Sequence, residues 1–295
     1  MILESVPNFS EGRRPDVCRA IADEARKAGA AVLDLTWDTD HHRSVLTLAG
    51  APAEIERAAF AVAKKALELI DLTVHRGKHP RMGAIDVLPF VPLRDATMAD
   101  AVALARAVGA RIGAELGLPV FLYESAASRP ERRNLAVVRA PQFEGLQSLI
   151  PNDPAWLPDF GPARIHPTGG AVAVGARMPL IAFNIDLETD DVDVARDIAR
   201  KIRERDGGLP GIKALGLYLD QRRCAQVSMN LCDYTKTGLL AVFDAVERLA
   251  APRGTSIRAG ELIGLVPAAA FPEDGARRLR LAAFDPSRIL ENRLP

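Results

Sequence analysis

Residues 180–205, LIAFNIDLETDDVDVARDIARKIRER, run from an apolar strand into an amphipathic helix. The strand covers Leu180 to Asp186, and from about Asp191 to Arg205 apolar residues recur at helical spacing. Asp191 suits the N-cap position, and Gly207-Gly208 suits the end of the helix. A strand, a second strand and a helix follow at 212–219, 225–231 and 238–249. This order is typical of a βαββαβ unit, whose helices cover one face of an antiparallel or mixed sheet.

The first half of the chain repeats this order of elements with little residue identity. A short strand at 2–6 precedes a first helix, and a second helix from about Ala53 to Ile70 precedes a strand at 85–91. Two β-rich runs lie between these helices on either side of a polar turn, as in a hairpin. A further helix and strand follow at 99–115 and 119–123. The next span contains several prolines and is expected to form loops.

Two repeated units within 295 residues predict an α/β (α+β) fold of two ferredoxin-like βαββαβ subdomains. Their boundary is expected near Arg177-Met178-Pro179, which gives an N-terminal subdomain of residues 1–177 and a C-terminal subdomain of residues 178–295. A sheet that helices cover on one side leaves its other face available. We therefore expect a substrate cleft or tunnel between the subdomains, because ligands commonly bind at such junctions.

The charge balance excludes whole classes of partner. Lys and Arg total 38, as do Asp and Glu, so neither nucleic acid nor a membrane surface would attract the chain as a whole. No run of about 18 apolar residues occurs, and no signal-peptide pattern opens the sequence. The three cysteines form no CxxC pair, so neither a disulfide framework nor a cysteine zinc site is expected. These features predict a soluble cytoplasmic protein with a small-molecule partner.

Residues 75–84, HRGKHPRMGA, have the composition of an active-site loop. Two histidines, three cationic side chains and two glycines occur between the second helix and the following strand. The proline after His79 keeps that residue extended, and neighbouring cations favour its neutral form, so it is the candidate general base. The same cations would repel a divalent metal ion, so no metal site is expected. The alternative is a loop of solvated histidines and ordinary surface charges.

Three other polar segments are candidates for ligand contact. The turn at 38–44 places Arg43 at a strand start, where it could bind a carboxylate, although hairpin tips are also commonly polar. The segment 6–12, VPNFSEG, offers amide and hydroxyl groups but could simply cap the next helix through Ser10 or nearby polar groups. The segment 159–170, DFGPARIHPTGG, could approach a ligand through its glycines or serve only as a connector. Phosphate-loop, dinucleotide, serine-nucleophile and zinc-protease motifs are absent, so no nucleotide cofactor is expected.

Together these segments resemble the glutamate formimidoyltransferase family, whose members occur alone or as the first half of formimidoyltransferase-cyclodeaminase. The motifs that carry the resemblance lie at 6–12, 40–44, 79–84, 159–162 and 175–184. The resemblance implies two α/β subdomains with a substrate tunnel between them, assembly as a homodimer, and a cytoplasmic enzyme of histidine catabolism and one-carbon metabolism. Such a transferase moves the formimino group from N-formimino-L-glutamate to tetrahydrofolate, giving 5-formimidoyltetrahydrofolate and L-glutamate. Tetrahydrofolate, including polyglutamyl folate, would be the co-substrate.

The resemblance also assigns site residues. The histidine before Pro-Arg-Met-Gly, here His79, would be catalytic. Candidate substrate-binding residues are Asn8, His42, Arg43, Lys78 and Arg81, and the Lys and Arg side chains among them would hold glutamate or folate carboxylates. Members of the family commonly have Asn where this chain has His42. Folate would contact the segment made of Gly161, Pro162, Ala163, Arg164, Ile165, His166, Pro167, Thr168, Gly169 and Gly170.

Two alternative functions remain compatible with the sequence. Another folate-linked activity, such as 5-formyltetrahydrofolate processing, would share the pterin pocket but take a different donor. A non-catalytic folate or amino-acid binding protein would use the histidines only to shape a pocket. A panel of donors tests the first alternative, and ligand binding without turnover would support the second.

Overall fold

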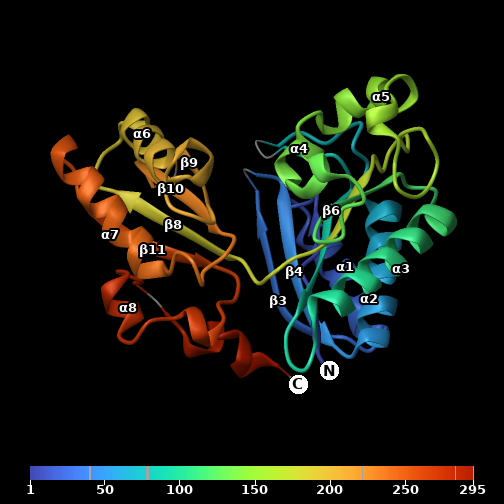
Figure 1. Ribbon diagram of the computed structural model, residues 1–295, viewed down its shortest axis with the longest axis horizontal. Helices are drawn as coiled ribbons and strands as arrows, with labels where there is room; N and C mark the ends of the chain where they lie inside the picture. The colour runs from blue at the N-terminus through green and yellow to red at the C-terminus, as the bar shows by residue number, and fades with distance from the viewer. Residues whose placement is uncertain (40, 78–79, 221, 283, 295) are drawn as a thin grey trace. The chain divides into compact units, whose positions relative to one another are not determined.

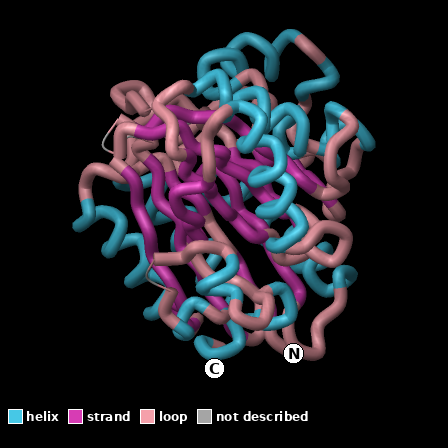
Figure 2. The backbone as a smooth tube through the Cα atoms, turned by 90° about the vertical axis from the view of Figure 1, so that its left-hand side faces the viewer, coloured by secondary structure: helices cyan, strands magenta, loops and turns pink. Residues whose placement is uncertain are grey.

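The computed structural model describes all residues except 40, 78–79, 221, 283 and 295. The chain forms two compact units, Met1–Arg177 and Met178–Leu294, each with its own sheet and its own core (Figure 1). The α/β fold that the sequence predicts is therefore confirmed. The path of the backbone through strands, helices and loops can be followed in Figure 2. Among the described residues, no helix is both long enough and apolar enough to cross a membrane.

The first unit has a seven-stranded mixed sheet. Its elements, in chain order, are β1 (Leu3–Ser5), β2 (Asn8–Phe9), α1 (Pro15–Lys27), β3 (Ala31–Asp38), β4 (Arg43–Gly50), α2 (Pro52–Leu69), β5 (Ile85–Pro92), α3 (Met98–Leu116), β6 (Val120–Glu124), α4 (Leu135–Arg139), α5 (Gln142–Asn152) and β7 (Val172–Ala176). The short strands β1 and β2 follow one another along a single position in the sheet. Each is antiparallel to β4 on one side and to β5 on the other. With β3 outside β4, these strands have the ferredoxin-like order, to which β7 and β6 add two parallel strands beyond β5.

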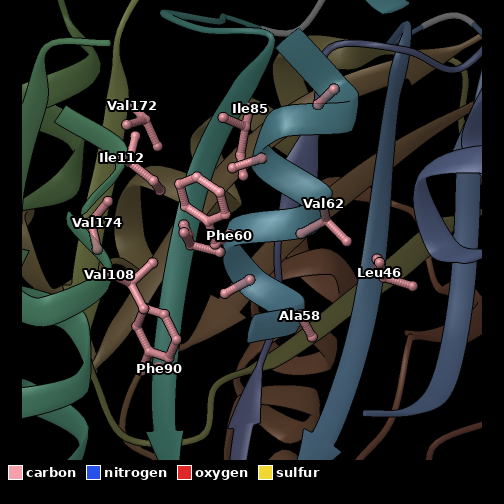
Figure 3. Packing of buried hydrophobic residues seen from close by; sticks show 14 of the residues in the cluster. Leu46, Ala58, Phe60, Val62, Ile85, Phe90, Val108, Ile112, Val172 and Val174 are labelled. Atoms are coloured by element: carbon pink, nitrogen blue, oxygen red, sulfur yellow. The ribbon is translucent and has the colours of Figure 1, made fainter. Parts of the chain in front are cut away.

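Helices α1, α2 and α3 pack on one face of this sheet (Figure 1). Figure 3 shows part of this core, in which Phe60 of α2 and Ile112 of α3 belong to one cluster with Ile85 of β5 and Val174 of β7. Burial of each such side chain contributes about 1.5–3 kcal/mol to stability. The core therefore fixes the ends of the strands from which the candidate site is built.

The opposite face of the sheet has an apolar half and a polar half. Alternate residues of β6 and β7 point to it, and Phe121 belongs there to a second cluster with Val138 of α4. Both α4 and α5 lie in the proline-containing span that the sequence analysis expects to form loops. Helices can form there because prolines near the ends of a helix are tolerated. Beside the apolar half, strands β2, β4 and β5 bring together the side chains of Asn8, Arg43 and Asp86.

The second unit is a four-stranded antiparallel sheet. Its elements are β8 (Ile181–Leu187), α6 (Val192–Ile202), β9 (Ile212–Leu219), β10 (Cys224–Leu231), α7 (Leu239–Ala250), β11 (Ile257–Ile263) and α8 (Gly275–Arg278). The strand order β11-β8-β10-β9 is the ferredoxin-like one. The Asp191 carboxylate accepts a hydrogen bond from the backbone N–H of Asp193 at 2.9 Å, which confirms the predicted N-cap. The α-helix ends at Ile202, three residues before the predicted end, and a short 3₁₀ turn follows at Glu204–Asp206.

Candidate active site

The histidine loop is described at 75–77 and 80–84, and the predicted base His79 and its neighbour Lys78 lie outside the described residues. The structure therefore shows only how the residues before and after His79 are held. Buried polar contacts hold the loop on both sides of the two undescribed residues. These contacts involve the stacked rings of His42 and His75, the Arg81 guanidinium and the backbone of Met82.

His42 and His75 stack with ring centroids 4.1 Å apart and planes 7° apart. The Arg81 Nε–H donates to Nδ1 of His75 at 3.2 Å, so this nitrogen carries no proton. The other ring nitrogen, Nε2, lies 3.0 Å from the carbonyl oxygen of His42 and must donate to it. Burial lowers the pKa of His75, and the positive charges of His42 and Arg81 lower it further, against the opposing effect of that hydrogen bond. His75 is thus held as a neutral imidazole with its proton on Nε2.

His42 has different partners. Its Nδ1 lies 3.1 Å from the carbonyl oxygen of Arg76, and its Nε2 lies 3.1 Å from Oε1 of Glu11. Both partners are acceptors, so the ring nitrogen that carries the proton can donate to one of them. The His42 ring joins the start of the histidine loop to the buried segment that precedes α1.

Glu11 is the buried acid of this segment, with 1% of its surface exposed. Its Oε1 accepts backbone N–H groups from Gly12, Arg13 and Arg14 at 2.9, 2.8 and 3.0 Å, and its Oε2 accepts from the Arg14 side chain at 2.6 Å. Burial raises the pKa of Glu11, but these hydrogen bonds outweigh it and leave the pKa below its ordinary value. The sequence shows this acid only as one polar residue among several.

Ser10 is one of the polar residues that could have capped the following helix, but it does not do so. Its hydroxyl donates to the carbonyl oxygen of Gly83 at 2.7 Å, and its backbone N–H donates to the carbonyl oxygen of Ala84 at 2.9 Å. Helix α1 begins after Arg14 with no side-chain cap, and Pro15 occupies its first turn. The VPNFSEG segment is therefore joined directly to the end of the histidine loop.

Arg81 links this loop to α5. Its two terminal nitrogens donate to the two carboxylate oxygens of Glu144 at 2.8 and 2.7 Å, which is a bidentate pair. Only 10% of the Arg81 side chain is exposed, and its Nε is used by His75. These contacts fix the orientation of the guanidinium within the fold. No local pattern in the sequence pairs Arg81 with Glu144, which lies 63 positions away.

Asp86 gathers two arginines on the polar half of the sheet. It is fully buried, and its Oδ2 lies 2.6 Å from NH1 of Arg43 and 2.7 Å from NH2 of Arg139. Its Oδ1 accepts the backbone N–H of Met82 at 2.7 Å, and Arg43 also donates to Oδ1 of Asn8. Burial raises the pKa of Asp86, but the two guanidiniums and the Met82 hydrogen bond leave it lowered. Asp86 is the one acidic residue in the apolar run 85–91, and that isolated charge is the sequence signal for a buried ion pair.

The glycine-rich segment predicted to contact folate lies against the histidine loop. The backbone N–H of Ala84 donates to Gly169 at 2.9 Å, and that of Ala171 donates to Met82 at 2.9 Å. A Cβ atom at Gly83 would overlap the carbonyl oxygen of Ala171, and one at Gly170 would overlap that of Met82. These glycines permit the close approach of the two backbones. The structure thus brings together two segments that are far apart in the sequence.

His166 closes a tight turn within the glycine-rich segment. Its backbone exchanges hydrogen bonds of 3.1 and 3.0 Å with Gly170, and its Nδ1 accepts the backbone N–H of Gly169 at 2.9 Å. The ring proton is therefore on Nε2, which has no hydrogen-bond partner in the part of the chain that is described. Burial lowers the pKa of His166. At the other end of the segment, Arg164 is exposed to solvent.

The start of this segment is anchored through Asp159. Its Oδ2 accepts the backbone N–H of Leu122 at 2.8 Å and NH1 of Arg132 at 2.8 Å. Gly161 has a φ of +83°, and a Cβ there would overlap the carbonyl oxygen of Leu118. The Asp-Phe-Gly-Pro motif therefore attaches the segment to β6.

A pocket of about 290 Å³ opens beside the stacked imidazoles. Glu11, Arg14, His42, Val74 and His75 are among the residues that line it. Its volume is near the lower end of the range of roughly 300–1,000 Å³ found for small-molecule sites. In the described parts of the chain, no three His, Cys, Asp or Glu residues are grouped so that they could hold a metal ion.

Comparison with known families gives two matches that together span most of the chain. Residues 2–177 match the N-terminal subdomain of the formiminotransferase domain. Residues 182–277 match the formiminotransferase domain. These matches fall on either side of the division between the two compact units.

Curated relatives are similar over most of the chain. A glutamate formimidoyltransferase from Streptococcus pyogenes serotype M1 is 46% identical over 99% of this chain and 98% of its own length. One from Thermoplasma acidophilum is 42% identical over 99% of this chain and 97% of its own length. The formimidoyltransferase-cyclodeaminase of Sus scrofa is 40% identical over 93% of this chain but only 52% of its own length. The similarity to the third protein is thus confined to about half of it.

Proposed function

We propose that this chain, which belongs to the formiminotransferase family, transfers the formimino group from N-formimino-L-glutamate to tetrahydrofolate. The products are 5-formimidoyltetrahydrofolate and L-glutamate. The observation that carries the proposal is the contact between the histidine loop and the glycine-rich segment, at Met82 to Ala84 and Gly169 to Ala171. This contact places the proposed folate-binding segment beside the loop that bears the proposed base. Tetrahydrofolate is the co-substrate, and no resident cofactor takes part in the proposed steps.

His79 is the proposed general base. It removes the proton from the attacking ring amine of tetrahydrofolate as that nitrogen adds to the amidine carbon. The carbon becomes tetrahedral, and the glutamate nitrogen must gain a proton before it leaves. The protonated imidazole supplies that proton, so one residue serves both steps. The hydrogen bonds of His75, Arg81 and Met82 support this role, because a general base must be held at a fixed distance from its substrate.

Substrate contacts are proposed for two groups of residues. Folate lies along residues 161–170, and the Nε2 proton of His166 is available for a hydrogen bond to it. Arg43 and Lys78 hold carboxylates of the two substrates, and Asn8 orients Arg43 through its amide oxygen. His42 and Arg81 act on the same site indirectly, by holding the histidine loop in place. The ring of His42 binds Glu11 and the backbone of Arg76. The guanidinium of Arg81 binds His75 and Glu144.

The organisation of the enzyme follows from the same proposal. Residues 1–177 form the subdomain with the catalytic histidine, and residues 178–295 form the second subdomain. The enzyme works as a cytoplasmic homodimer in histidine degradation. The family relationship supports these assignments.

A spectrophotometric assay with formiminoglutamate and tetrahydrofolate tests the activity. We expect formation of 5-formimidoyltetrahydrofolate, and release of one glutamate for each formimino group transferred. Replacing the donor with 5-formyltetrahydrofolate or formylglutamate should give a much lower rate. Turnover of 5-formyltetrahydrofolate alone would favour a different folate-linked activity, and folate binding without turnover of any donor would favour a non-catalytic binding protein.

A further inference from the structure

We propose that the pocket beside the stacked imidazoles holds the formimino donor, and that Arg13 binds one of the donor's carboxylates. This inference rests on the function proposed above and names the donor's site. Formiminoglutamate and tetrahydrofolate each carry two carboxylates, and Arg43 and Lys78 provide for only two of these four. In the sequence Arg13 stands next to Arg14 in a polar segment, and only the structure tells the two arginines apart.

The first observation is that the fold orients the Arg13 guanidinium and leaves its end unused. The backbone N–H of Arg13 donates to Oε1 of Glu11 at 2.8 Å, and the side-chain Nε donates to the carbonyl oxygen of Thr39 at 3.1 Å. The two terminal nitrogens of Arg13 have no acceptor among the residues that the structure describes. A guanidinium held in this way presents a fork of N–H donors that matches the two oxygens of a carboxylate.

Arg14, in contrast, is committed to the fold. Its Nε donates to Oε2 of Glu11 at 2.6 Å, and its NH2 donates to the carbonyl oxygen of Leu69 at 3.0 Å. These bonds connect the segment before α1 to the end of α2, where both contribute to the pocket wall. Of the two arginines that line the pocket, only Arg13 therefore has both terminal nitrogens available for a ligand.

The second observation is the mixed character of the pocket wall. Apolar surface comes from Leu69, Ile70 and Val74, at the end of α2 and in the turn that follows, and Val74 is 75% exposed. The two arginines are accompanied by two acids, Glu11 and Asp71. Formiminoglutamate combines the same features, because it has methylene groups, two carboxylates and a basic amidine. The pocket therefore suits this donor in both polarity and charge.

The third observation is the size and the position of the pocket. Its volume of about 290 Å³ suits a small ligand, and formiminoglutamate is much the smaller of the two substrates. His75 lines the pocket, and His79 follows it by four residues, so the chain allows at most about 14 Å between them. A donor in the pocket would therefore lie near the loop that bears the proposed base.

Calorimetric titration of the full chain with L-glutamate, L-glutamine and L-isoglutamine tests the site. Each amide lacks the charge of one carboxylate of glutamate. We expect the unaltered protein to bind glutamate about tenfold more tightly than one of the two amides, as expected for a charge-assisted bidentate contact. In Arg13→Gln this preference should fall below about threefold, whereas Arg13→Lys should keep part of it. Arg19→Gln is the control and should keep all of it, because Arg19 lies over Trp37 and does not line the pocket.

A second variant tests whether the carboxylate is bound in this pocket. Val74→Glu adds a negative charge at an exposed position of the wall and should weaken glutamate binding by about five- to tenfold. Val137→Glu makes the same change at an exposed valine of α4, outside the pocket, and should leave glutamate binding unchanged.

A purely structural role for Arg13 would weaken all three ligands by the same factor. That result overturns the proposal, as does an unchanged preference in Arg13→Gln, equal glutamate binding by the two valine variants, or no preference in the unaltered protein. Turnover of formiminoglutamate by the same preparations separates these outcomes from the proposed function. Normal turnover with no carboxylate preference rejects the Arg13 site alone. Loss of the preference in Arg13→Gln, together with weaker glutamate binding by Val74→Glu, supports the site even if no turnover is seen.

Discussion

His42 and His75 stack face to face with ring centroids 4.1 Å apart, yet the two rings have different hydrogen-bond partners. His42 faces an acceptor at each ring nitrogen, whereas His75 accepts from Arg81 and donates to a carbonyl group. His75 is therefore a neutral imidazole. A proton on its Nδ1 would remove the acceptor that orients Arg81. The arrangement holds the beginning of the histidine loop in one geometry.

The protonation of His75 predicts a dependence of stability on pH. Its pKa is lowered in the folded protein, chiefly by burial, so the unfolded chain binds the proton more readily. The stabilising contribution of the neutral ring is present above the unfolded value of about 6.5 and is lost as the pH falls through the lower folded value. We expect ¹⁵N NMR at pH 6 to show a neutral ring with its proton on Nε2.

Chemical denaturation checks the same prediction independently. The free energy of unfolding should decrease below about pH 6.5, and part of that decrease should be missing in His75→Gln, which cannot titrate. A His75 ring protonated on both nitrogens at pH 6, or identical pH profiles for the two proteins, would refute the assignment.

Removing the charge of Asp86 should be strongly destabilising. Asp86→Asn leaves Arg43 and Arg139 without their shared carboxylate in a largely buried place, and loss of one partner of a buried ion pair costs about 3–5 kcal/mol. The exposed pair of Asp23 and Arg26 provides the control, because removing a surface pair costs about 0–1 kcal/mol. Urea unfolding of Asp86→Asn and Asp23→Asn measures the difference. Equal effects of the two substitutions would contradict the role given to Asp86.

The fold was largely predictable because its strands and helices are recorded in local patterns. The apolar runs at 180–186 and 212–219 and the capping residue Asp191 identify the second unit without any long-range information. The addition of β6 and β7 to the first sheet was not predictable in the same way. Their parallel pairing depends on contacts between residues separated by about fifty positions, and no turn in the sequence signals it.

The candidate site was predictable in its segments but not in its partners. Loops rich in His, Arg and Gly are visible in the sequence, whereas the pairing of Arg81 with Glu144 and of Arg139 with Asp86 arises only when the chain folds. Glu11 is another example, since its importance comes from burial and from three backbone donors. His79 and Lys78 remain predictions from sequence, because both lie outside the described residues.

A side chain at Gly83 should disrupt the junction of the two loops. Gly83→Ala would push a methyl group into the carbonyl oxygen of Ala171, and would move the glycine-rich segment away from the histidine loop. We expect lower stability and at least a tenfold rise in the Kd for tetrahydrofolate, equivalent to about 1.4 kcal/mol. Gly238→Ala is the matched control, since the nearest atom to a Cβ there is 3.9 Å away. Fluorescence titration with tetrahydrofolate measures both variants, and wild-type affinity in Gly83→Ala would count against the proposed junction.

The central claim is that the imidazole of His79 transfers the proton during formimino transfer, and the kcat of His79→Ala tests it most directly. We predict a decrease of about 10²–10⁴-fold, the usual contribution of a general base, with the Kd for tetrahydrofolate nearly unchanged. Added imidazole should restore part of the rate as its concentration rises, because it can occupy the vacated space and accept the proton. A variant that retains near-normal kcat without imidazole would contradict the account.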